Sequence, residues 1–410
     1  MTYRAPKGTD DILAPDSRLW LEAERGFFDL AERYGYDLVL TPLFEQTELF
    51  ARGVGESTEV VEKQMYSFTD KGGRSLTLRP EATASVVRAV IEAGGTTGPF
   101  KGVYWGPMFR YERPQAGRRR QFMQGGVEYL GEAAPEADIE VIDFGYRYLK
   151  NLNVPEVQVE LNSIGDAADR TRYREELGSF LESRSDRLSD QARTRMKTNP
   201  LRVLDSKEDA EVVADAPSPS DHLGAEAGAH FETVRAGLER LGIPYVINPR
   251  LVRGLDYYNR TVWEYIPLRY GAAQNSVGGG GRYDGLFELL GGRPTPAVGL
   301  AMGVDRIILA MEKAEEEPAL DAFLVSASPE HLTEALALAT RLRSDGLRVD
   351  LDVGGRSVKA QFRAADRRRA RSAIVVGEEF ADREVTVRDL ATGNQDTIPV
   401  EEIGPWLEQR

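Results

Sequence analysis

The sequence contains no cysteine and only three histidines among its 410 residues. The absence of cysteine excludes disulfides, zinc sites built from thiolates and catalysis by a thiol. The three histidines, His222, His230 and His331, lie in polar or helical surroundings, far from the motifs described below. A histidine-ligated metal centre or a Ser/His/Asp triad is therefore not expected.

Long apolar runs are also missing. No stretch approaches the roughly 18 apolar residues that would span a membrane. The first residues, MTYRAPKGTDDILAPDS, lack the basic and then apolar pattern of a signal peptide, so a cytoplasmic location is expected. The formal net charge of -14 argues against a protein that coats nucleic acid nonspecifically. A local basic patch on an acidic body could still bind phosphates.

The length predicts two or three domains. The acidic stretch EKAEEEPALD is the expected boundary, which separates a first domain, residues 1–320, from a second, residues 321–410. At about 167–235 charged, helix-favouring residues predominate, which predicts an inserted helical module. The second domain alternates strands and helices in βαβαβ order, and is therefore predicted to be a small α/β domain.

Local signals in the first domain place several polar residues at the ends of elements. A helix is expected after Pro15, a strand broken at Pro42, and a short strand that runs into a helix at Pro80. Glu81 would then lie at a strand-to-helix junction. Two apolar strands between residues 103 and 130 flank the polar loop RPQAGRRRQ, which predicts an antiparallel hairpin.

Alternation along the hairpin strands would group its polar side chains. We expect Arg110 and Glu112 on one face of the first strand, and Phe122, Gln124 and Glu128 on one face of the second. Aromatic residues such as Tyr111 lie on the opposite face, where they are available to a core. A polar face of this kind is either solvated or lines a site. The loop arginines are either an ordinary soluble charge run or donors to phosphate.

The glycine-rich run VGGGGRYDGL fits neither the dinucleotide-binding fingerprint nor the P-loop, which disfavours enzymes of both kinds. Its glycines would serve close backbone packing or, less often, approach to a flat ligand. The segment AVGLAMGVDRIILAME is predicted to be an apolar helix with Gly299 and Gly303 as a small-residue stripe. A lone Arg306 there is usually a surface residue, paired with Asp305.

The stretch RGLDYYNRTVWE, residues 253–264, combines charge, glycine and two adjacent tyrosines. Arg253 and Tyr258 cannot share a face of a regular strand, so Gly254 must break the regularity if they act together. The strand that follows would place Tyr258, Arg260, Val262 and Glu264 on one face. A ligand with both a donor and an acceptor would satisfy a buried tyrosine and carboxylate.

Taken in order, these motifs resemble those of class II aminoacyl-tRNA synthetases, and among them the histidyl-tRNA synthetase family. YGYDLVLTPLFE resembles the first, dimer-forming motif, MFRYERPQAGRRRQF the second and AVGLAMGVDRIILAME the third. LVRGLDYYNRTVWE and VGGGGRYDGL resemble the two signatures that distinguish the histidine enzymes. TNPLRVLDSK and VDLDVGGRSVKAQFRAADRRRA also match, so the resemblance covers essentially the whole chain.

The resemblance implies an α+β catalytic domain, with an antiparallel sheet flanked by helices and a helical insertion, followed by an α/β anticodon-binding domain. It implies a homodimeric ligase that makes histidyl-adenylate from L-histidine and ATP with Mg²⁺, and then esterifies tRNA(His). By similarity, Arg110 would hold the α-phosphate and the histidine carboxylate, Glu112 the adenine, and Arg306 the far end of the triphosphate. Arg253 would neutralise the α-phosphate, in place of a metal ion that related enzymes use.

The same resemblance assigns the remaining site residues. Glu81, Thr83 and Gln124 would recognise the α-amino group of histidine, whereas Glu128 and Tyr258, together with Tyr283, would hydrogen-bond its imidazole. The acceptor stem of tRNA would meet Gln115, Arg118, Arg119 and Arg120. Lys359, Arg363 and Arg367 recur at intervals of four on a helix at about 357–370. For an isolated helix a solvated face is favoured, but the resemblance implies the anticodon arm.

One departure from the family pattern is Met123, where the family typically has histidine. Strand parity turns Met123 away from Gln124 and Glu128, so a packing change is expected, with a changed rate of transfer as the alternative.

The rival function is a non-catalytic, synthetase-like regulatory subunit of ATP phosphoribosyltransferase. Arg110, Arg253 and Arg306 and the C-terminal domain all argue against it.

Overall fold

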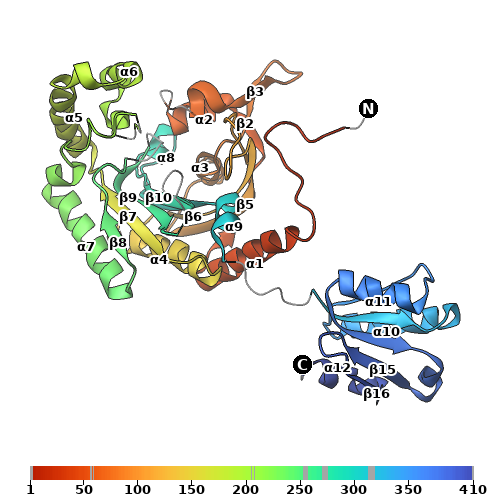
Figure 1. The fold of residues 1–410 in the computed structure, drawn as a ribbon. Helices are drawn as coiled ribbons and strands as arrows, with labels where there is room; N and C mark the ends of the chain where they lie inside the picture. The colour runs from red at the N-terminus through yellow and green to blue at the C-terminus, as the bar shows by residue number, and fades with distance from the viewer. Residues whose placement is uncertain are drawn as a thin grey trace. The chain divides into compact units, whose positions relative to one another are not determined.

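The computed structural model describes residues 3–55, 58, 60–204, 206, 208–252, 257–269, 276–312 and 319–408. The chain divides into two compact units, Met1–Glu312 and Lys313–Arg410, each with its own hydrophobic core (Figure 1). The division falls within the acidic stretch that the sequence marks as the boundary.

An eight-stranded sheet forms the centre of the first unit. Its order is β1 (Asp37–Leu38), β5 (Phe100–Phe109), β6 (Gln121–Leu130), β11 (Ala297–Gly303), β10 (Gly278–Arg282), β9 (Asn259–Pro267), β7 (Val157–Ser163) and β8 (Tyr245–Ile247). Neighbours are antiparallel except at the two edges, where β1 pairs with β5 and β7 with β8 in parallel. The predicted antiparallel sheet is thus confirmed, and β5 and β6 form the predicted hairpin.

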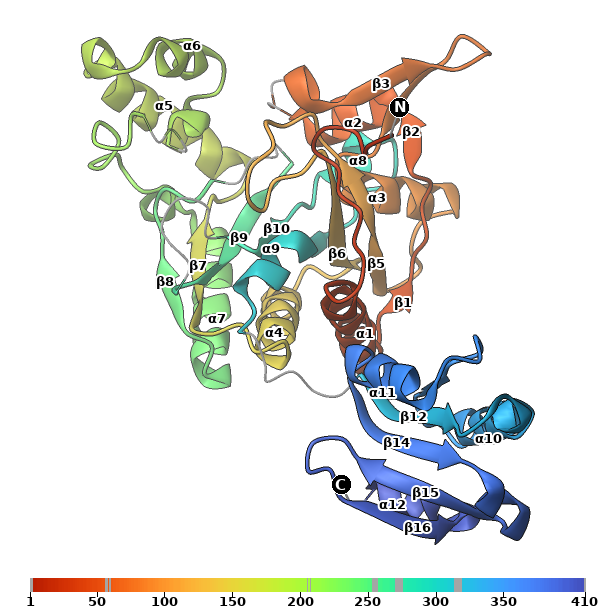
Figure 2. The same ribbon diagram turned by 45° about the vertical axis from the view of Figure 1, so that its right-hand side comes forward.

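Three helices cover one face of this sheet, α1 (Ser17–Arg33), α4 (Pro135–Asn151) and α7 (Ala225–Leu241), as Figures 1 and 2 show. Apolar residues at helical spacing form the buried side of α1, as predicted. Phe27 on α1 meets Phe144 and Tyr148 on α4 edge to face, with ring centroids 5.3 and 4.9 Å apart. This core leaves the opposite face of the central strands free to line a site.

The elements beside that opposite face are short. A three-stranded sheet has the order β2 (Phe44–Gln46), β4 (Ser75–Leu78) and β3 (Tyr66–Thr69), and β1 and β2 flank the predicted break at Pro42. The helices are α2 (Thr47–Val54), a π-helical turn (Val60–Gln64), α3 (Thr83–Glu92) and α8 (Leu286–Leu289). The expected helix start at Pro80 is wrong, because α3 begins at Thr83, where the Glu81 carboxylate accepts the first free backbone N–H groups.

The prediction of one helix over AVGLAMGVDRIILAME is also wrong. Residues Ala297–Gly303 form strand β11 between β6 and β10, and only Val304–Ala310 form a helix, α9. A short apolar run fits a buried strand as well as a helix, and periodicity alone does not separate them. The glycines decide, because a Cβ on Gly299 would collide with Glu128 of β6.

The inserted module is helical, as predicted. It contains α5 (Ala167–Glu182), α6 (Asp190–Thr198) and 3₁₀ turns at Ser185–Arg187, Pro200–Val203 and Pro219–His222. The last helix of the predicted interval, α7, instead belongs to the main body, because it runs to Leu241 and packs on α4. Tyr173 and Leu177 of α5 share one hydrophobic cluster with Tyr257 and Tyr258.

The second unit has a five-stranded sheet with the order β13 (Val349–Leu351), β12 (Leu320–Ser326), β14 (Ala370–Val376), β15 (Glu384–Asp389) and β16 (Gln395–Pro399). Its helices are α10 (Leu332–Ser344), α11 (Val358–Arg367) and α12 (Ile403–Glu408), with 3₁₀ turns at Pro329–His331, Glu378–Asp382 and Val400–Glu402. The βαβαβ order predicted from the sequence is confirmed. Within the described ranges of either unit, no helix is long and apolar enough to cross a lipid bilayer.

Candidate active site

A deep cleft opens on the sheet face opposite α1 and α4. It encloses about 1020 Å³ of space, including its open mouth. Most predicted binding residues line it: Glu81, Thr83, Arg110, Glu112, Arg118, Arg119, Gln124, Tyr258, Tyr283 and Arg306. Arg253 lies outside the described residues. The fold therefore brings residues from six separated segments of the chain to one cavity.

Glu128 lies on β6 and is 1 % exposed; it does not itself line the cavity but contacts Thr83 and Tyr283, which do. Its Oε1 accepts a 2.7 Å hydrogen bond from the Thr83 hydroxyl, and its Oε2 accepts one from Tyr283. Burial raises the pKa of Glu128 to about 8, and these two donors only partly offset that effect. Gly299 leaves room for the carboxylate, since a Cβ there would lie 1.7 Å from Oε2.

Three tyrosines form the wall beside Glu128. Tyr257, Tyr258 and Tyr283 are all buried, and their rings pack together with centroids 4.7 to 6.5 Å apart. Gly281 of β10 makes space for the ring of Tyr258, because a Cβ would lie 2.6 Å from it. The glycine run thus serves close packing against the site, as well as against strand β11. The result is an aromatic pocket with a carboxyl group at one side.

Glu81 and Gln124 supply further polar groups to the inner cleft. Burial raises the pKa of Glu81, although its hydrogen bonds from the Ala84 and Thr83 backbone and the charge of Arg110 oppose the shift. Among the described residues, the side-chain oxygen of Gln124 has no hydrogen-bond partner although it is buried. A buried acceptor without a partner costs free energy, which a ligand that donates a hydrogen bond would recover.

Arg110 and Glu112 lie nearer the mouth of the cleft. The expectation that both stand on a strand face is wrong, because β5 ends at Phe109 and both residues belong to the loop. Arg110 Nε donates to the carbonyl of Pro80 over 2.9 Å, and its guanidinium lies 5.3 Å from the centre of the Phe122 ring. These contacts hold a cation at the cleft wall.

Arg306 supplies a second cation to the lining of the cleft. Its Nε donates to the carbonyl of Gly117 over 3.0 Å and its Nη1 to that of Ser276 over 2.9 Å. Burial and the nearby Arg118 lower its pKa. The surface position and the pairing with Asp305 expected from the sequence are both wrong. Asp305 instead accepts from the backbone N–H of Met123, over 2.9 Å, and pairs with Arg119.

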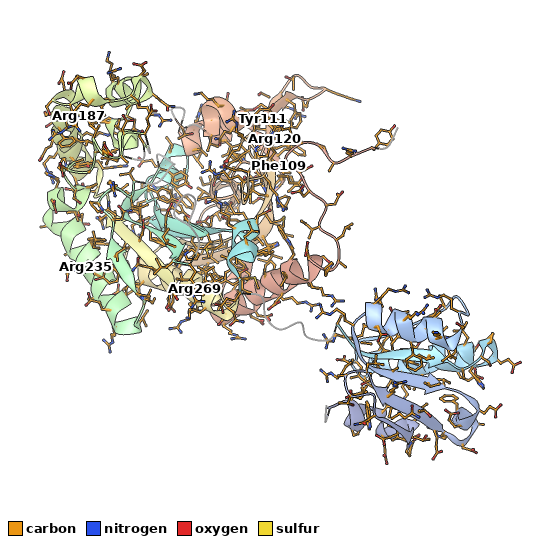
Figure 3. All side chains as sticks on the ribbon, in the orientation of Figure 1. Phe109, Tyr111, Arg120, Arg187, Arg235 and Arg269 are labelled. Atoms are coloured by element: carbon orange, nitrogen blue, oxygen red, sulfur yellow. The ribbon has the colours of Figure 1, made fainter. Side chains whose placement is uncertain are left out.

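The loop arginines predicted to bind tRNA differ in their surroundings. Arg119 is shared between Asp10 and Asp305, each 3.1 Å away, and Arg118 lies 3.7 Å from Glu112. Arg120 lies 3.8 Å above the ring of Tyr111, which is exposed and not in a core (Figure 3). Gln115 forms a tight turn with Arg118.

Strand β9 does not have the regular face that the sequence suggested. Arg260 has a positive φ of 50° and pairs with Glu226 of α7, away from the cleft. Tyr258 and Glu264 both line the cleft, whereas Val262 is buried in the core beneath. The irregularity coincides with a shift of register between β9 and β10, at Gly281 and Arg282.

Three residues of the cleft region were not selected as site residues from the sequence: Tyr104, Tyr257 and Asp305. Tyr104 is buried beside Gly126, and burial, followed by the charge of Glu128, raises its pKa well above the ordinary value. Its parity on β5 is the same as that of Arg110, a signal that could have found it. Met123 packs against the core on the other side of β6, as parity predicts.

The predicted basic stripe lies on α11 of the second unit. Lys359, Arg363 and Arg367 are all exposed, whereas Ala364 and Ala365 are buried. Arg356, just before the helix, pairs with Asp352. The stripe is therefore a row of cations that faces solvent. Both interpretations given above, a solvated face and a contact with the anticodon arm, require this exposure.

The antiparallel sheet and the arginine-lined cleft define a class II aminoacyl-tRNA synthetase. The family model described as histidyl-tRNA synthetase matches residues 8–307, and the anticodon binding domain matches residues 321–410. The chain belongs to the histidyl-tRNA synthetase family.

Individual relatives match over the whole chain. The histidine–tRNA ligase of Geobacillus kaustophilus (strain HTA426) is 44 % identical, over 100 % of this chain and 99 % of its own length. That of Nocardia farcinica (strain IFM 10152) is 47 % identical, over 98 % and 97 %. The crystal structure of apo S. aureus histidyl-tRNA synthetase superposes with a TM-score of 0.80 at 36 % identity, and covers 99 % of this chain and 100 % of that one.

Proposed function

We propose that the chain ligates L-histidine to tRNA(His) in two steps, through histidyl-adenylate. The observation that carries the proposal is the inner pocket. Tyr258 and Tyr283 line the cleft together with arginines, and the buried carboxyl of Glu128 lies directly behind the lining, bonded to Thr83 and Tyr283. Family membership supports it, since the relatives that match the whole chain are named histidine–tRNA ligases.

The inner pocket suits an imidazole ring. Glu128 would accept from one ring nitrogen and a tyrosine hydroxyl would contact the other, so an amino acid without those nitrogens would leave buried polar groups unpaired. The α-amino group of histidine would lie near Glu81, Thr83 and Gln124. There the carboxyl of Glu81, the hydroxyl of Thr83 and the amide oxygen of Gln124 offer hydrogen-bond acceptors. The free acceptor of Gln124 supports this placement.

The first step is attack of the histidine carboxylate on the α-phosphorus of ATP, with pyrophosphate leaving. Such a reaction depends on alignment and on neutralisation of developing charge. Arg110 would hold the α-phosphate and the carboxylate, Arg306 the far phosphate and Glu112 the adenine. Arg253, outside the described residues, is proposed from the family motif to neutralise the α-phosphate.

Members of this family use ATP and typically a divalent metal, and we propose Mg²⁺. Among the described residues no three His, Asp or Glu side chains are grouped as metal ligands. Mg²⁺ commonly binds through substrate phosphates with few protein ligands, which fits this cleft. When bound, the ion would screen the charge of the phosphates that leave as pyrophosphate. The chain's own part is to bind and align the triphosphate.

In the second step the terminal adenosine of tRNA would take the histidyl group. We propose that Gln115, Arg118, Arg119 and Arg120 meet the acceptor stem, and that Lys359, Arg363 and Arg367 meet the anticodon arm. We further propose residues 1–320 and 321–410 as the functional domains, a homodimer built on the YGYDLVLTPLFE segment, and a cytoplasmic location, where free ATP and tRNA are available.

Exchange of labelled pyrophosphate into ATP, in the absence of tRNA, tests the proposal. Histidine should support exchange, and each of the other amino acids should not. Arg253→Ala should abolish exchange and leave the dimer folded, as monitored by light scattering and circular dichroism. A folded dimer that binds histidine but exchanges nothing would instead favour the regulatory subunit, and would point to Met123 as the decisive departure.

A further inference from the structure

A group of buried charges lies directly behind the imidazole pocket. Arg282 on β10, the residue before Tyr283, is 0 % exposed, and so is Asp138 on α4. Arg282 Nε donates to Asp138 Oδ2 over 3.0 Å, and Nη2 donates to the same oxygen. Nη1 and Nη2 also reach the carbonyls of Glu132 and Ala134, over 3.0 and 3.1 Å. With a bond to Asp284, all five N–H groups of the guanidinium are used.

His230 extends this group on the side away from the pocket. The sequence places it far from every motif, but the packing of α7 on α4 brings His230 Nε2 to 3.4 Å from Asp138 Oδ1. Burial alone would raise the pKa of Asp138, yet His230 and Arg282 hold that pKa below its ordinary value. The carboxylate is therefore a fixed anion, held from both sides.

On the pocket side, the group continues into a reciprocal pair of side chains. Arg282 Nη1 donates to Asp284 Oδ1 over 3.2 Å. Asp284 Oδ2 accepts from Asn259 Nδ2 over 2.8 Å, and the Asp284 backbone N–H donates to Asn259 Oδ1 over 2.9 Å. Asn259 directly follows Tyr258 and Asp284 directly follows Tyr283. The pair thus connects the backbones of the two pocket tyrosines.

This connection lies where the sheet itself gives the least control. The register of β9 against β10 shifts between Gly281 and Arg282, and Arg282 opposite Asn259 is the last pair of the two strands. Tyr283 is held to β11 by a 2.7 Å bond from its backbone N–H to the Ala297 carbonyl. The side-chain pair, anchored in Arg282 and Asp138, then connects the Tyr283 segment back to the Tyr258 segment. The two rings stand with centroids 6.5 Å apart, beside Glu128.

We propose that the Asn259–Asp284 pair, anchored by Arg282 and Asp138, is a positioning element that sets the spacing of Tyr258 and Tyr283 and thereby the selectivity for histidine. The proposal rests on the proposed function, because it assigns the imidazole to that pocket. Arg282 and Asp138 are fully buried, whereas the Asp284 side chain is 31 % exposed. A buried, hydrogen-bonded anchor of this kind can specify one geometry at a cost in stability. Within the described residues, the side-chain hydrogen bonds of the pair join its two members to each other, to Arg282 and to the Ala297 backbone, and none reaches Arg110, Glu112 or Arg306, so its loss should affect the two substrates unequally.

A reciprocal exchange of the two side chains tests the pair. Asn259→Asp alone places two carboxylates face to face, which removes the bond between the side chains. Asp284→Asn alone leaves one acceptor oxygen where two are used, so it must give up either the bond from Asn259 or those from Arg282 and the Ala297 backbone N–H. The double variant N259D/D284N restores one donor and one acceptor, but the side chain at position 284 now donates and the one at position 259 accepts. Steady-state pyrophosphate exchange gives KM for histidine and for ATP, and thermal unfolding reports the fold of each variant.

Each single variant should raise the histidine KM by about tenfold, as expected for coupled neighbours, with the ATP KM changed by less than about twofold. The double variant should recover most of the histidine KM. Equal rises for both substrates, or a double variant no better than the singles, would overturn the proposal. If the wild type shows no histidine-dependent exchange, the proposed function fails separately, and calorimetric titration with histidine of the same four proteins then decides whether the pair positions the pocket.

Discussion

At the scale of single residues, Glu128 makes the clearest quantitative prediction. Its folded-state pKa of about 8 exceeds the ordinary 4.5, so the folded protein binds the extra proton between these pH values. Its contribution to stability is therefore fully present below pH 4.5 and is lost as the pH rises towards 8. The Glu128 part of the unfolding free energy should fall by on the order of 5 kcal/mol over this range.

Urea denaturation of the wild type and Glu128→Gln at several pH values measures this part, because Gln keeps the shape and cannot titrate. The difference between the two curves should change with pH as stated, and parallel curves would contradict the assignment. Histidine provides a control, since an imidazole that donates to the carboxylate lowers its pKa. Binding near pH 7 should then release a proton, which calorimetry in buffers of different ionisation enthalpy detects.

The same residue shows what a sequence can and cannot locate. Glu128, Gln124 and Thr83 could be selected from the sequence because strand parity and a motif resemblance are both read from residues that are close together along the chain. Asp305, in contrast, was assigned to Arg306, its neighbour in sequence, but it pairs with Arg119 of a distant loop. His230 was set apart from the motifs although it contacts Asp138. Contacts between elements depend on packing, which local periodicity does not encode.

At the scale of elements, strand β11 is where the expectation of a helix failed, and its glycine offers a sharp test. Gly299→Ala places a Cβ within 1.7 Å of Glu128 Oε2, so the carboxylate must move. A displacement near 1 Å at a reacting site can cost about 100-fold in rate, and histidine-dependent exchange should fall by at least that factor. Gly285→Ala is the matched control, because a Cβ there meets nothing within 4 Å. Similar losses in both variants would show that the effect is not one of contact with Glu128.

Helix α11 gives a second prediction at this scale. If its exposed cations contact tRNA phosphates, Arg363→Ala should raise the KM for tRNA(His) by about threefold to tenfold and reduce the salt dependence of binding by about one unit of slope. Pyrophosphate exchange without tRNA should be unchanged. Arg341→Ala, an exposed arginine on α10, removes the same charge elsewhere in this unit. Equal effects of the two substitutions would support the solvated-face interpretation of the stripe.

At the scale of the whole molecule, the chain is two units with separate cores. The first unit contains every described residue of the cleft, and the second contains the α11 stripe. The acidic stretch and the switch to strand and helix alternation made this division visible in the sequence, because composition changes where one core ends and another begins. The inserted module was harder to delimit, since α7 continues its composition but packs on α4.

The division of the chain into two units predicts that removal of the second unit affects adenylate formation and transfer to tRNA unequally. A chain ending at Glu312 keeps every hydrophobic cluster described in the first unit, and should therefore fold and exchange pyrophosphate with histidine at close to the full-length rate. Aminoacylation of tRNA(His) at low tRNA concentration should fall by at least about 100-fold, because loss of one of two linked binding modules removes that much avidity. Saturating tRNA should recover part of the rate if the missing unit contributes binding alone. A truncated chain that is folded and still binds histidine but no longer exchanges pyrophosphate would show instead that the second unit is needed for adenylate formation.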